Sequence, residues 1–488
     1  MRLKAKFSNW FAGKAIVILN EASAAKINAH VGDRVLISSK SGDAVAVMDI
    51  SNQLVDDSHV ILSQEIIPEL NISKGQFVDV EVAKNPKMSY IINKKLDGKS
   101  LSEREIFLIV NSIVKNELSE IEIAFFISAV YKSGMSLDEI GYFTKAIFNT
   151  GDKLSINGKY IVDKHCIGGL AGNRTTPIIV SICSSEGLIF PKNSSRAITS
   201  AAGTADVMET ICKVDFNEKE IKQIVKKTGA CLVWGGSLGF APADDKIISV
   251  ERMINIDPEP NLIASIISKK LAAGSKYILI DIPFGVHAKV SKKQGLALKR
   301  KFETLGRRFN LKLKCVLTPG NEPIGNGIGP ALEIRDVISV LNGDGPQDLR
   351  DKSLFLSGEI FELAGKCKKG EGKIMARQAL DSGRAFNQFS KIVEAQHGKI
   401  QKVPLGKFSR TIKSSKNGKI ASINNKDINL IARISGCPKD KRAGIYLHVH
   451  VGYKVKKFQP LLTIYSQSLS KLNQAVEFYK EHETIKFG

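Results

Sequence analysis

The residues with the clearest chemical potential lie between Asp163 and Thr176, in the segment Asp-Lys-His-Cys-Ile-Gly-Gly-Leu-Ala-Gly-Asn-Arg-Thr-Thr. They place an ammonium group, an imidazole, a thiol and two hydroxyls around three glycines. Glycine tolerates positive φ and lets backbone N–H groups point into one concavity, and a helix that begins near Thr175 would direct its positive end to the same place. The segment therefore predicts a site for an oxyanion. It is neither a Walker A loop nor a GxGxxG loop.

A second polar tract follows, from Ser194 to Asp206, and consists of small and hydroxylated residues around one guanidinium group. Between the two tracts lies Pro177–Cys183, an apolar run that is compatible with a buried helix or with a buried strand. Either tract alone is typical of an ordinary loop. Two such tracts at the ends of one buried element favour a phosphate site.

The elements that must position these tracts change in character along the chain. Residues 1–86 alternate short β-branched runs with turns that contain glycine and aspartate, which predicts a small β-rich domain. Its expected strands are Ala15–Leu19, Arg34–Ser38, Ala44–Met48 and Gln76–Val82. The next residues, Asn85–Lys87, are typical of a linker.

Residues 87–156 have a helical period, which predicts an α-helical domain. Further helices of this domain are expected around residues 242–275. One apolar stripe consists of Ile106, Ile109, Val110 and Ile113. Helix N-caps are expected at serines that directly precede acidic residues, namely Ser102, Ser119 and Ser136. The apolar faces are best explained as core or as a subunit interface.

Residues 157–390 alternate strand-like runs with amphipathic ones, and the clearest strands are Tyr277–Ile282 and Leu313–Leu317. This alternation predicts an α/β domain with a mostly parallel sheet that carries the phosphate site. The fold class of the chain is therefore α/β, with a helical domain and with additional β-rich domains at both ends.

The last part, residues 391–488, is expected to be a basic, β-rich domain of α+β type. Its strand-like runs are Ala443–His450 and Gln459–Tyr465. His448 and His450 would share one strand face, but two histidines without a third ligand are an insufficient basis for a metal site. No bound metal is expected.

The composition excludes several classes of protein. The chain has 488 residues, 43% of them hydrophobic, which is enough for about two to four domains. Its apolar runs fall short of the roughly 20 residues that span a bilayer, and the N-terminal segment lacks the apolar core of a secretory signal. The seven cysteines are scattered without CxxC spacing, which favours free thiols. These features predict a cytoplasmic protein that is not bound to a membrane.

The net charge of +22 is concentrated near the C-terminus, because residues 391–457 hold 16 Lys and Arg against 3 Asp and Glu. Residues 1–90 hold 10 of each sign. A basic surface can bind polyanions or steer anionic substrates. No RNA- or DNA-binding motif accompanies the lysines, and aromatic residues do not interleave with them, so nucleic acid is not an expected partner.

The sequence resembles the thymidine and pyrimidine-nucleoside phosphorylase superfamily. Asp163-Lys164-His165 followed by Gly168-Gly169 is similar to the signature of that superfamily, and Ser194–Asp206 is most similar to its AMP phosphorylase branch. The resemblance covers nearly the whole chain in order and continues through Ala241–Asp244, Ile256–Pro258, Ala264–Leu271 and Gly329–Glu333. The N-terminal β-rich domain points to the same branch, because the usual thymidine phosphorylases begin directly with helices.

The resemblance implies residue roles in phosphorolysis, in which phosphate attacks the anomeric carbon while the base leaves. The phosphate contacts would be Lys164, Cys166, Thr176, Ser194 and Thr204. His165 would face the base and donate a hydrogen bond or a proton, since an imidazole titrates near neutral pH. In the AMP phosphorylase branch the proton donor to a purine is an aspartate that maps to Asp257, and such a donor needs a raised pKa.

The remaining implied contacts are to the nucleoside or nucleotide: Gly169, Ser195, Arg196, Ala197, Ile198, Thr199, Ser200, Arg252, Ser265, Lys269 and Lys289. Ser265 and Lys269 are four residues apart and would share one helix face. Two positions depart from the family pattern. Cys166 stands where many relatives have serine, and a thiol is a weaker donor than a hydroxyl. His287 interrupts a small-residue pattern beside Lys289.

The substrate stays open between two possibilities. Arg252, Ser265 and Lys269 are compatible with thymidine, which phosphate would convert to thymine and 2-deoxyribose 1-phosphate. The tract Ser195–Ser200 and Lys289 are compatible with AMP or another nucleoside 5′-monophosphate, which would give a base and ribose 1,5-bisphosphate. The resemblance further implies a homodimer, domain closure and no cofactor besides phosphate as co-substrate. The alternatives are an anthranilate-type phosphoribosyltransferase and a non-catalytic nucleotide or RNA binder.

Overall fold

The chain forms two compact units. The computed structural model describes all residues except 84–85 and 198–199. The first unit comprises Met1–Gly151 and Ala241–Ser268, and the second comprises Asp152–Phe240 and Lys269–Gly488. The segment from Ala241 to Ser268, which contains most of the helices predicted around residues 242–275, therefore packs with the N-terminal part of the chain.

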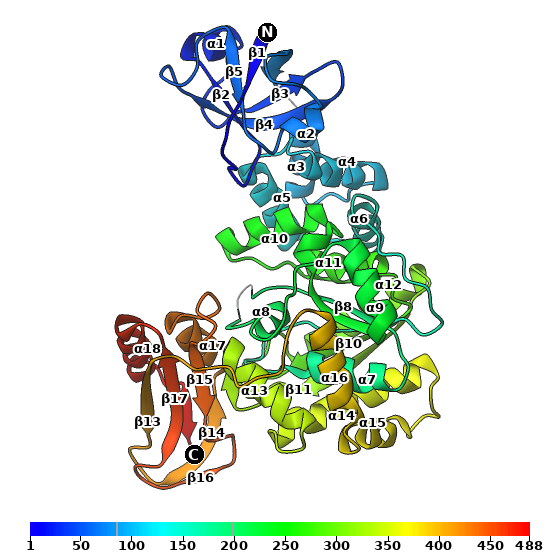
Figure 1. Cartoon of the computed structure of the whole chain (residues 1–488), viewed down its shortest axis with the longest axis vertical. Helices are drawn as coiled ribbons and strands as arrows, with labels where there is room; N and C mark the ends of the chain where they lie inside the picture. Colours follow the sequence, from blue (N-terminus) through cyan, green and yellow to red (C-terminus); the bar gives the residue numbers. More distant parts are fainter. Residues whose placement is uncertain (84–85, 198–199) are drawn as a thin grey trace. The chain divides into compact units, whose positions relative to one another are not determined.

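The N-terminal residues form a closed six-stranded barrel with the strand order β1-β5-β2-β4-β3-β6 (Figure 1, blue). Its core consists of small and β-branched side chains such as Val17, Val35 and Val80, which are buried. Two short helices, α1 (Glu21–Lys26) and α2 (Ile67–Leu70), connect the strands. The strands are β1 (Arg2–Phe7), β2 (Ile16–Leu19), β3 (Arg34–Ser38), β4 (Asp43–Ile50), β5 (His59–Leu62) and β6 (Phe77–Val82).

Four of these strands cover the four runs predicted from the sequence, and β1 and β5 were not predicted. In β1 the exposed positions are Arg2 and Lys4, so the strand shows little hydrophobic signal. Strand β5 has only four residues, and parallel pairing with β1 and antiparallel pairing with β2 hold it in the barrel. Both strands are therefore defined by their partners in the barrel.

The helical part of the first unit contains α3 (Pro86–Leu96), α4 (Glu103–Val114), α5 (Glu120–Ser133), α6 (Leu137–Asn149), α10 (Pro242–Ile254) and most of α11 (Glu259–Ala272). The serine N-caps predicted for α4, α5 and α6 are confirmed, and each forms a capping box with a glutamate three residues later. The predicted linker is wrong in part, because Pro86 and Lys87 begin α3. Proline fits the first turn of a helix, where its missing N–H leaves no unpaired partner. Asn85 lies outside the described residues.

The second unit contains a parallel sheet in the order β11-β10-β7 and a parallel pair β8-β9. A parallel bridge between Ile161 and Ile189 brings the start of β7 next to the start of β8. The strands are β7 (Val162–Cys166), β8 (Phe190–Ser194), β9 (Ala230–Trp234), β10 (Tyr277–Phe284) and β11 (Lys312–Pro319). Ligands bind at the carboxyl ends of the strands in sheets of this type.

Helices pack against this sheet, and α7 is the central one. The apolar run between the two polar tracts is α7 (Thr175–Ser185), in which every residue from Thr175 to Ser184 is buried. The other helices are α8 (Thr204–Met208), α9 (Glu218–Thr228), the 3₁₀ helix η1 (Gly235–Leu238), α12 (Lys292–Arg308), α13 (Pro330–Leu341), α14 (Gln347–Ala364), α15 (Gly372–Asp381) and α16 (Arg384–Ala395). Helix α16 runs past the predicted domain boundary at residue 390, because its buried face continues through Ile392 and Val393.

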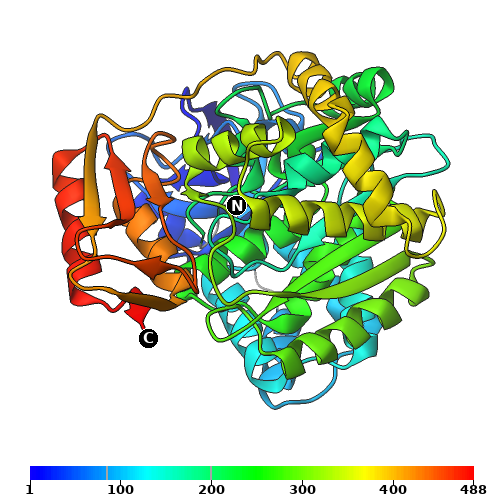
Figure 2. The same cartoon turned by 90° about the horizontal axis from the view of Figure 1, so that it is seen from below.

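The C-terminal region adds two small sheets, in the orders β12-β15-β17-β13 and β16-β14-β18. Figure 2 shows α18 (red) beside these strands, and α17 also packs on this region. The elements are β12 (Gly327–Ile328), β13 (Phe408–Lys413), β14 (Gly418–Ile423), α17 (Asn425–Ile434), β15 (Gly444–Leu447), β16 (Lys454–Val455), β17 (Pro460–Ser466), α18 (Leu469–Glu481) and β18 (Ile485–Phe487).

The predicted strand Ala443–His450 is too long. Strand β15 ends at Leu447, so His448 and His450 do not share a strand face. His448 hydrogen-bonds with Thr463, and His450 hydrogen-bonds with Glu322 and Asn326. The described residues contain no group of three or more His, Cys, Asp or Glu side chains that could hold a metal ion. Across the same residues, none of the helices combines the length and the apolar character needed to cross a bilayer.

Candidate functional site

The predicted oxyanion segment begins inside strand β7, whose successive side chains point to opposite faces of the sheet. Asp163 and His165 therefore lie on one face, and Lys164 and Cys166 lie on the other. In the parallel pairing with β10, Asp281 is in register with Cys166, so its side chain shares the face of Lys164. The two faces carry separate clusters of buried charges.

The first cluster surrounds Lys164, whose side chain is almost completely buried. Its Nζ donates a hydrogen bond to Thr175 Oγ1 at 3.0 Å and lies 3.9 Å from Asp281 Oδ2. Burial lowers the pKa of this lysine. The hydroxyl of Thr175 belongs to the first residue of α7, so the ammonium group lies at the N-terminal end of that helix. An ammonium group has three donors, and a ligand at this helix end could accept from those that Thr175 does not use.

Asp281 is fully buried, and its carboxylate lies near the ammonium groups of two lysines. Lys352, on α14, lies 3.1 Å from Asp281 Oδ2, and Thr318 donates a hydrogen bond to Oδ1 at 2.6 Å. Burial by itself would raise the pKa of Asp281, but Lys352 and Lys164 outweigh burial and hold that pKa below its usual value. This carboxyl is therefore ionised at neutral pH.

The second cluster surrounds Asp163, which is also fully buried. Its two oxygens accept hydrogen bonds from Lys192 Nζ at 3.0 Å and from Lys270 Nζ at 2.8 Å. Lys192 also donates to the backbone oxygen of Lys164 at 2.8 Å. Burial opposes ionisation of Asp163, but the two ammonium groups outweigh it and hold the pKa of the carboxyl below its usual value.

Together the clusters contain four buried lysines and only two buried aspartates, so cationic side chains outnumber the carboxylates. Burial lowers the pKa of Lys192 to about 7, and an anion bound nearby would favour its charged form. An uncompensated buried charge is costly, and a bound anion would balance it. Nearby, the buried hydroxyl oxygen of Ser194 has no hydrogen-bond partner among the described residues, and the same holds for the side-chain nitrogen of Asn193. The excess of lysines over carboxylates and the unpartnered donors both fit an oxyanion.

The other predicted phosphate contacts lie around the same helix ends. Thr176 is buried at the second position of α7, and Thr204 begins α8. Arg174 donates a hydrogen bond to Thr204 Oγ1 at 2.8 Å, which leaves the hydroxyl proton of Thr204 available to a ligand. Asn173 donates to the sulfur of Cys166 at 3.4 Å. Burial, and next Asp281, raise the pKa of Cys166, so this thiol is not a thiolate nucleophile at neutral pH.

The glycine part of the segment adopts the backbone that the sequence predicts. Gly168 and Gly169 have φ values of +90° and +89°, in the left-handed region. A Cβ atom on Gly169 would lie 2.6 Å from the backbone nitrogen of Lys289. Glycine therefore allows this loop to approach Lys289, and the structure brings these two predicted substrate contacts together.

The tract after β8 is organised by acidic side chains. Arg196 forms a bidentate pair with Glu209, at 2.6 and 2.8 Å, and its guanidinium lies over the ring of Trp234. Asp206 accepts from the backbone N–H of Ala197 at 2.7 Å. Arg196 was predicted as a substrate contact, but its donors to Glu209 hold the loop in place in this structure. Ser195 is exposed, Ser200 is half-buried, and Ile198 and Thr199 lie outside the described residues.

His165 is half-buried on the face of the Asp163 cluster. Burial, followed by the ammonium groups of Lys270 and Lys192, holds the pKa of His165 well below its usual value. Its imidazole is therefore neutral near pH 7, and the expectation that it titrates there is wrong. A neutral imidazole still offers one N–H donor and one acceptor nitrogen.

The remaining predicted substrate contacts lie on α10, on α11 and between them. Arg252 and Asp257 are exposed, and Ser265 donates a hydrogen bond to Asp244 at 2.8 Å. These three belong to the first unit, whereas Lys269, further along α11, belongs to the second unit and is half-buried. Ser265 and Lys269 both lie in α11, as their spacing predicts.

Three family models match consecutive parts of the chain. The helical bundle domain of the glycosyl transferase family matches residues 89–151, and the a/b domain of the same family matches residues 158–386. The pyrimidine nucleoside phosphorylase C-terminal domain matches residues 419–486.

Relatives that align with nearly the whole chain are named AMP phosphorylase. The relative from Pyrococcus abyssi is 45% identical over 100% of this chain and 98% of its own length, and the one from Thermococcus kodakarensis is 42% identical with the same coverage. The relative from Methanococcus vannielii is 41% identical over 97% of this chain and 95% of its own length. The chain belongs to the AMP phosphorylase-like branch of the pyrimidine-nucleoside phosphorylase superfamily. It is a pentosyltransferase of the phosphorylase type.

A solved structure is similar to this phosphorylase in fold. Anthranilate phosphoribosyltransferase from Thermus thermophilus aligns with a TM-score of 0.53 and 18% identity, over 63% of this chain and 99% of the other. At this identity the similarity concerns the fold alone.

Several residues of the phosphorylase were missed in the sequence: the half-buried Arg174 and the buried Lys192, Lys270, Asp281 and Lys352. Arg174 forms an ion pair with Glu333 at 2.6 Å and links α7 to Thr204. The four others complete the two charge clusters around Lys164 and Asp163. A lysine or aspartate within an otherwise apolar run, as in Ile280-Asp281-Ile282, is the signal that could have found some of them.

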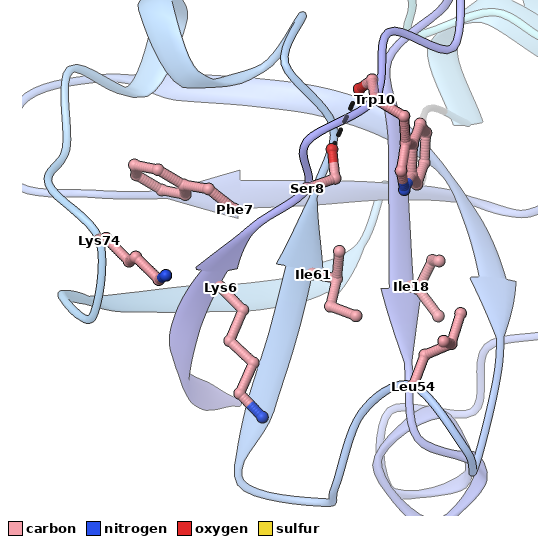
Figure 3. Close-up of a pocket in the computed structure, with 8 residues that line it drawn as sticks. All are labelled: Lys6, Phe7, Ser8, Trp10, Ile18, Leu54, Ile61 and Lys74. Carbon is pink, nitrogen blue, oxygen red and sulfur yellow. Dashed lines mark hydrogen bonds between the residues drawn. The ribbon is translucent and has the colours of Figure 1, made fainter.

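A surface pocket lies in the N-terminal barrel of the phosphorylase, with a volume of about 330 Å³ (Figure 3). Its lining combines apolar and basic side chains, namely Lys6, Phe7, Ser8, Trp10, Ile18, Leu54, Ile61 and Lys74. Lys6 is paired with Asp56 at 3.2 Å. None of the predicted site residues lines this pocket.

The basic C-terminal part of the phosphorylase carries aromatic contacts that its sequence did not indicate. The lysine Nζ atoms of three residues lie over phenylalanine rings: Lys407 over Phe408, Lys416 over Phe487 and Lys457 over Phe458. All three pairs lie within the C-terminal region. The contacts account for part of the lysine-rich surface as intramolecular packing.

Replacing Gly169 with alanine is expected to raise the KM for the nucleoside or nucleotide substrate about tenfold. The new methyl group would displace Lys289, which is a predicted substrate contact. The matched control is Gly168→Ala. Gly168 has nearly the same φ, and nothing lies within 4 Å of a Cβ atom at that position. Both variants carry the strain of a left-handed alanine, about 1–2 kcal/mol, so the difference between them isolates the contact with Lys289. If the two variants had equal KM values for this substrate, the close approach of Gly169 to Lys289 would not contribute to substrate binding.

Proposed function

We propose that this chain is a nucleoside 5′-monophosphate phosphorylase with AMP as its substrate. Phosphate attacks C1′ of the ribose, the bond from C1′ to the base nitrogen breaks, and the base leaves with a proton. The products are adenine and ribose 1,5-bisphosphate. Inorganic phosphate is the co-substrate, no other cofactor takes part, and the enzyme acts as a homodimer.

The observation that carries the choice of substrate is the full-length similarity to relatives named AMP phosphorylase. These alignments include the N-terminal barrel, which the usual thymidine phosphorylases lack. The relatives therefore favour AMP over thymidine, although both substrates would use the same phosphate site. Thymidine remains the alternative because Arg252, Ser265 and Lys269 are compatible with a pyrimidine.

The phosphate half of the proposal is supported by the buried charges of the second unit. Lys164 presents its amino group at the N-terminal end of α7, and in the clusters around it lysines outnumber carboxylates. Ser194, Thr176 and Thr204 supply hydroxyl groups near the ends of β8, α7 and α8. These donors would stabilise the negative charge on the attacking phosphate and hold it in line with C1′.

The nucleotide half is supported by the loop geometry. The backbone of Gly169 lies close to that of Lys289, and residues 200–203, which follow the two undescribed positions of the tract, lead into α8. In the proposed complex, Lys289 and the small polar residues of this tract bind the 5′-phosphate. A nucleoside lacks this second anion and would use fewer of these contacts.

Protonation of the leaving base is assigned to Asp257, and His165 is assigned a hydrogen bond to the base as a neutral imidazole. The low pKa of His165 supports this division, because a neutral imidazole is a poor proton donor. A carboxylic acid donates a proton at neutral pH when nearby negative charge raises its pKa, and the substrate phosphates would supply such charge.

The proposal is tested by incubating the pure protein with AMP, CMP, UMP, adenosine and thymidine, with and without phosphate. Release of adenine from AMP only when phosphate is present is the expected result. Faster release of thymine from thymidine would reassign the substrate. Base release driven by pyrophosphate would indicate a phosphoribosyltransferase, and no release from any substrate would leave a non-catalytic binder.

The role of His165 can be separated from proton donation with the variant His165→Gln, which keeps an N–H donor and cannot be protonated near neutral pH. We expect kcat to fall by less than tenfold, whereas loss of a general acid costs about 10²–10⁴-fold. The imidazole should also show no protonation between pH 6 and 8 by NMR. A fall in kcat by a factor of about 10³, or a titration of His165 near its ordinary pKa of about 6.5, would contradict this assignment.

A further inference from the structure

Lys352 is a buried ammonium group that the reaction described so far does not use. It lies on α14, far along the chain from the two polar tracts at 163–176 and 194–206, and 7% of its side chain is exposed. Its Nζ lies 3.1 Å from Asp281 Oδ2 but makes no hydrogen bond of good geometry among the described residues. A charged group in such a place is costly unless it balances another charge.

The charge that Lys352 balances is Asp281, which has two candidate cations. Lys352 is the closer one, at 3.1 Å, and Lys164 is farther away, at 3.9 Å. Thr318 holds the other carboxylate oxygen by a hydrogen bond of 2.6 Å. Since Coulomb attraction falls with distance, Lys352 supplies a larger share of the compensation of Asp281 than Lys164 does.

The position of Lys164 agrees with a larger role of Lys352 in compensating Asp281. Its Nζ donates to the hydroxyl of Thr175 at 3.0 Å, which keeps the ammonium group toward the start of α7. Without Lys352, Asp281 would retain one cation, Lys164, and would compete with phosphate for it. In a buried site such competition is strong because water screens it little.

We propose that Lys352 is a positioning residue for phosphate binding, which neutralises Asp281 and thereby leaves Lys164 to bind phosphate. The proposal deepens the function given above and rests on it for the identity of the anion. Lys352 need not touch phosphate in this role. Its effect is expected on phosphate affinity and not on the chemical step.

The primary test is the variant Lys352→Met, which keeps the length of the apolar stem and removes the charge. We expect KM for phosphate to rise about tenfold at saturating AMP, with kcat changed by less than about twofold, and we expect inorganic phosphate to bind more weakly in a calorimetric titration without nucleotide. The matched control is Arg350→Met on the same helix. Arg350 pairs with Asp381 at 2.6 Å, so its loss should leave the phosphate KM unchanged.

The decisive measurement is the double variant Asp281→Asn, Lys352→Met. Because it removes the competing carboxylate as well, we expect its KM for phosphate to return to within about twofold of the wild-type value. A merely structural role of Lys352 predicts that the double variant is no better than Lys352→Met. That result, or an unchanged phosphate KM in Lys352→Met, would overturn the proposal.

If Lys352→Met does not fold, the single variant Asp281→Asn gives a second test. It leaves both lysines without their carboxylate, so phosphate should bind at least as tightly as in the wild type, and weaker binding would overturn the proposal. Failure of the proposed function is a separate result. In that case the wild type releases no base with phosphate, and the phosphate titration still tests Lys352.

Discussion

Replacing Lys164 with methionine is expected to lower kcat/KM for phosphate by about 10³-fold. Lys164 is buried at the start of α7, where phosphate is proposed to bind, and donates to Thr175 at 3.0 Å. Removal of one preorganised donor to a developing charge typically costs about 10²–10³-fold, and a charged donor lies at the upper end of this range. Phosphate saturation curves at saturating AMP measure this effect.

Stability should not fall in the same variant, because a buried charge is itself costly and Asp281 keeps Lys352 and Thr318 as partners. A thermal melt therefore separates loss of function from loss of fold. Lys159→Met is a suitable control, since Lys159 is an exposed lysine shortly before β7. If Lys164→Met retained the wild-type dependence on phosphate concentration, Lys164 would not be a phosphate ligand.

Replacing Asp163 with asparagine is expected to destabilise the second unit by about 3–5 kcal/mol, the usual result of breaking a buried ion pair. Asp163 is fully buried and accepts one hydrogen bond each from Lys192 and Lys270. Asparagine preserves the shape and leaves two buried ammonium groups without a counter-charge. Urea unfolding of the variant and the wild type measures the difference.

The pH dependence of this effect has a defined sign. The folded-state pKa of Asp163 lies below its usual value, so its stabilising contribution is present above the unfolded pKa, about 3.9, and is lost as the pH falls through the folded pKa. In Asp163→Asn, Lys192 loses its counter-charge, and burial already lowers the pKa of Lys192 to about 7 in the wild type. The part of the penalty that comes from Lys192 should therefore shrink as the pH rises through about 7, because this lysine is then neutral in both proteins.

Two further variants check the origin of the loss. Asp163→Asn combined with Lys270→Met removes one of the two unpaired cations and should recover part of the stability. Asp56→Asn, at an exposed carboxylate that pairs with Lys6, should cost much less stability than Asp163→Asn. An Asp163→Asn variant as stable as Asp56→Asn would show that the buried cluster contributes nothing to folding.

Local signals in the sequence were sufficient for many elements of the fold. Ser102, Ser119 and Ser136 mark helix starts because a side-chain oxygen and an acidic residue three positions later satisfy N–H groups of the same helix. The glycines after Cys166 predicted a left-handed backbone because few other residues adopt it. In each case the interacting groups lie within a few residues of one another.

Pro177–Cys183 shows where local signals were insufficient. Its continuous apolar character fits a buried helix and a buried strand equally well. Packing against α14 and α16 decides for the helix, because it buries every residue from Thr175 to Ser184. The short strand β5 was not predicted for the same reason, because its pairing with β1 and β2 in the barrel defines it.

The sequence by itself determined the family, and it predicted a phosphate-binding segment with Lys164 as its central cation from residues that are adjacent in the chain. The tertiary structure alone decided how the charges are balanced. Asp163 meets Lys192 and Lys270, and Asp281 meets Lys352, across separations of 29 to 107 residues. It also decided that His165 is neutral, since a pKa depends on every charge that folding brings near the group and on the water that folding removes.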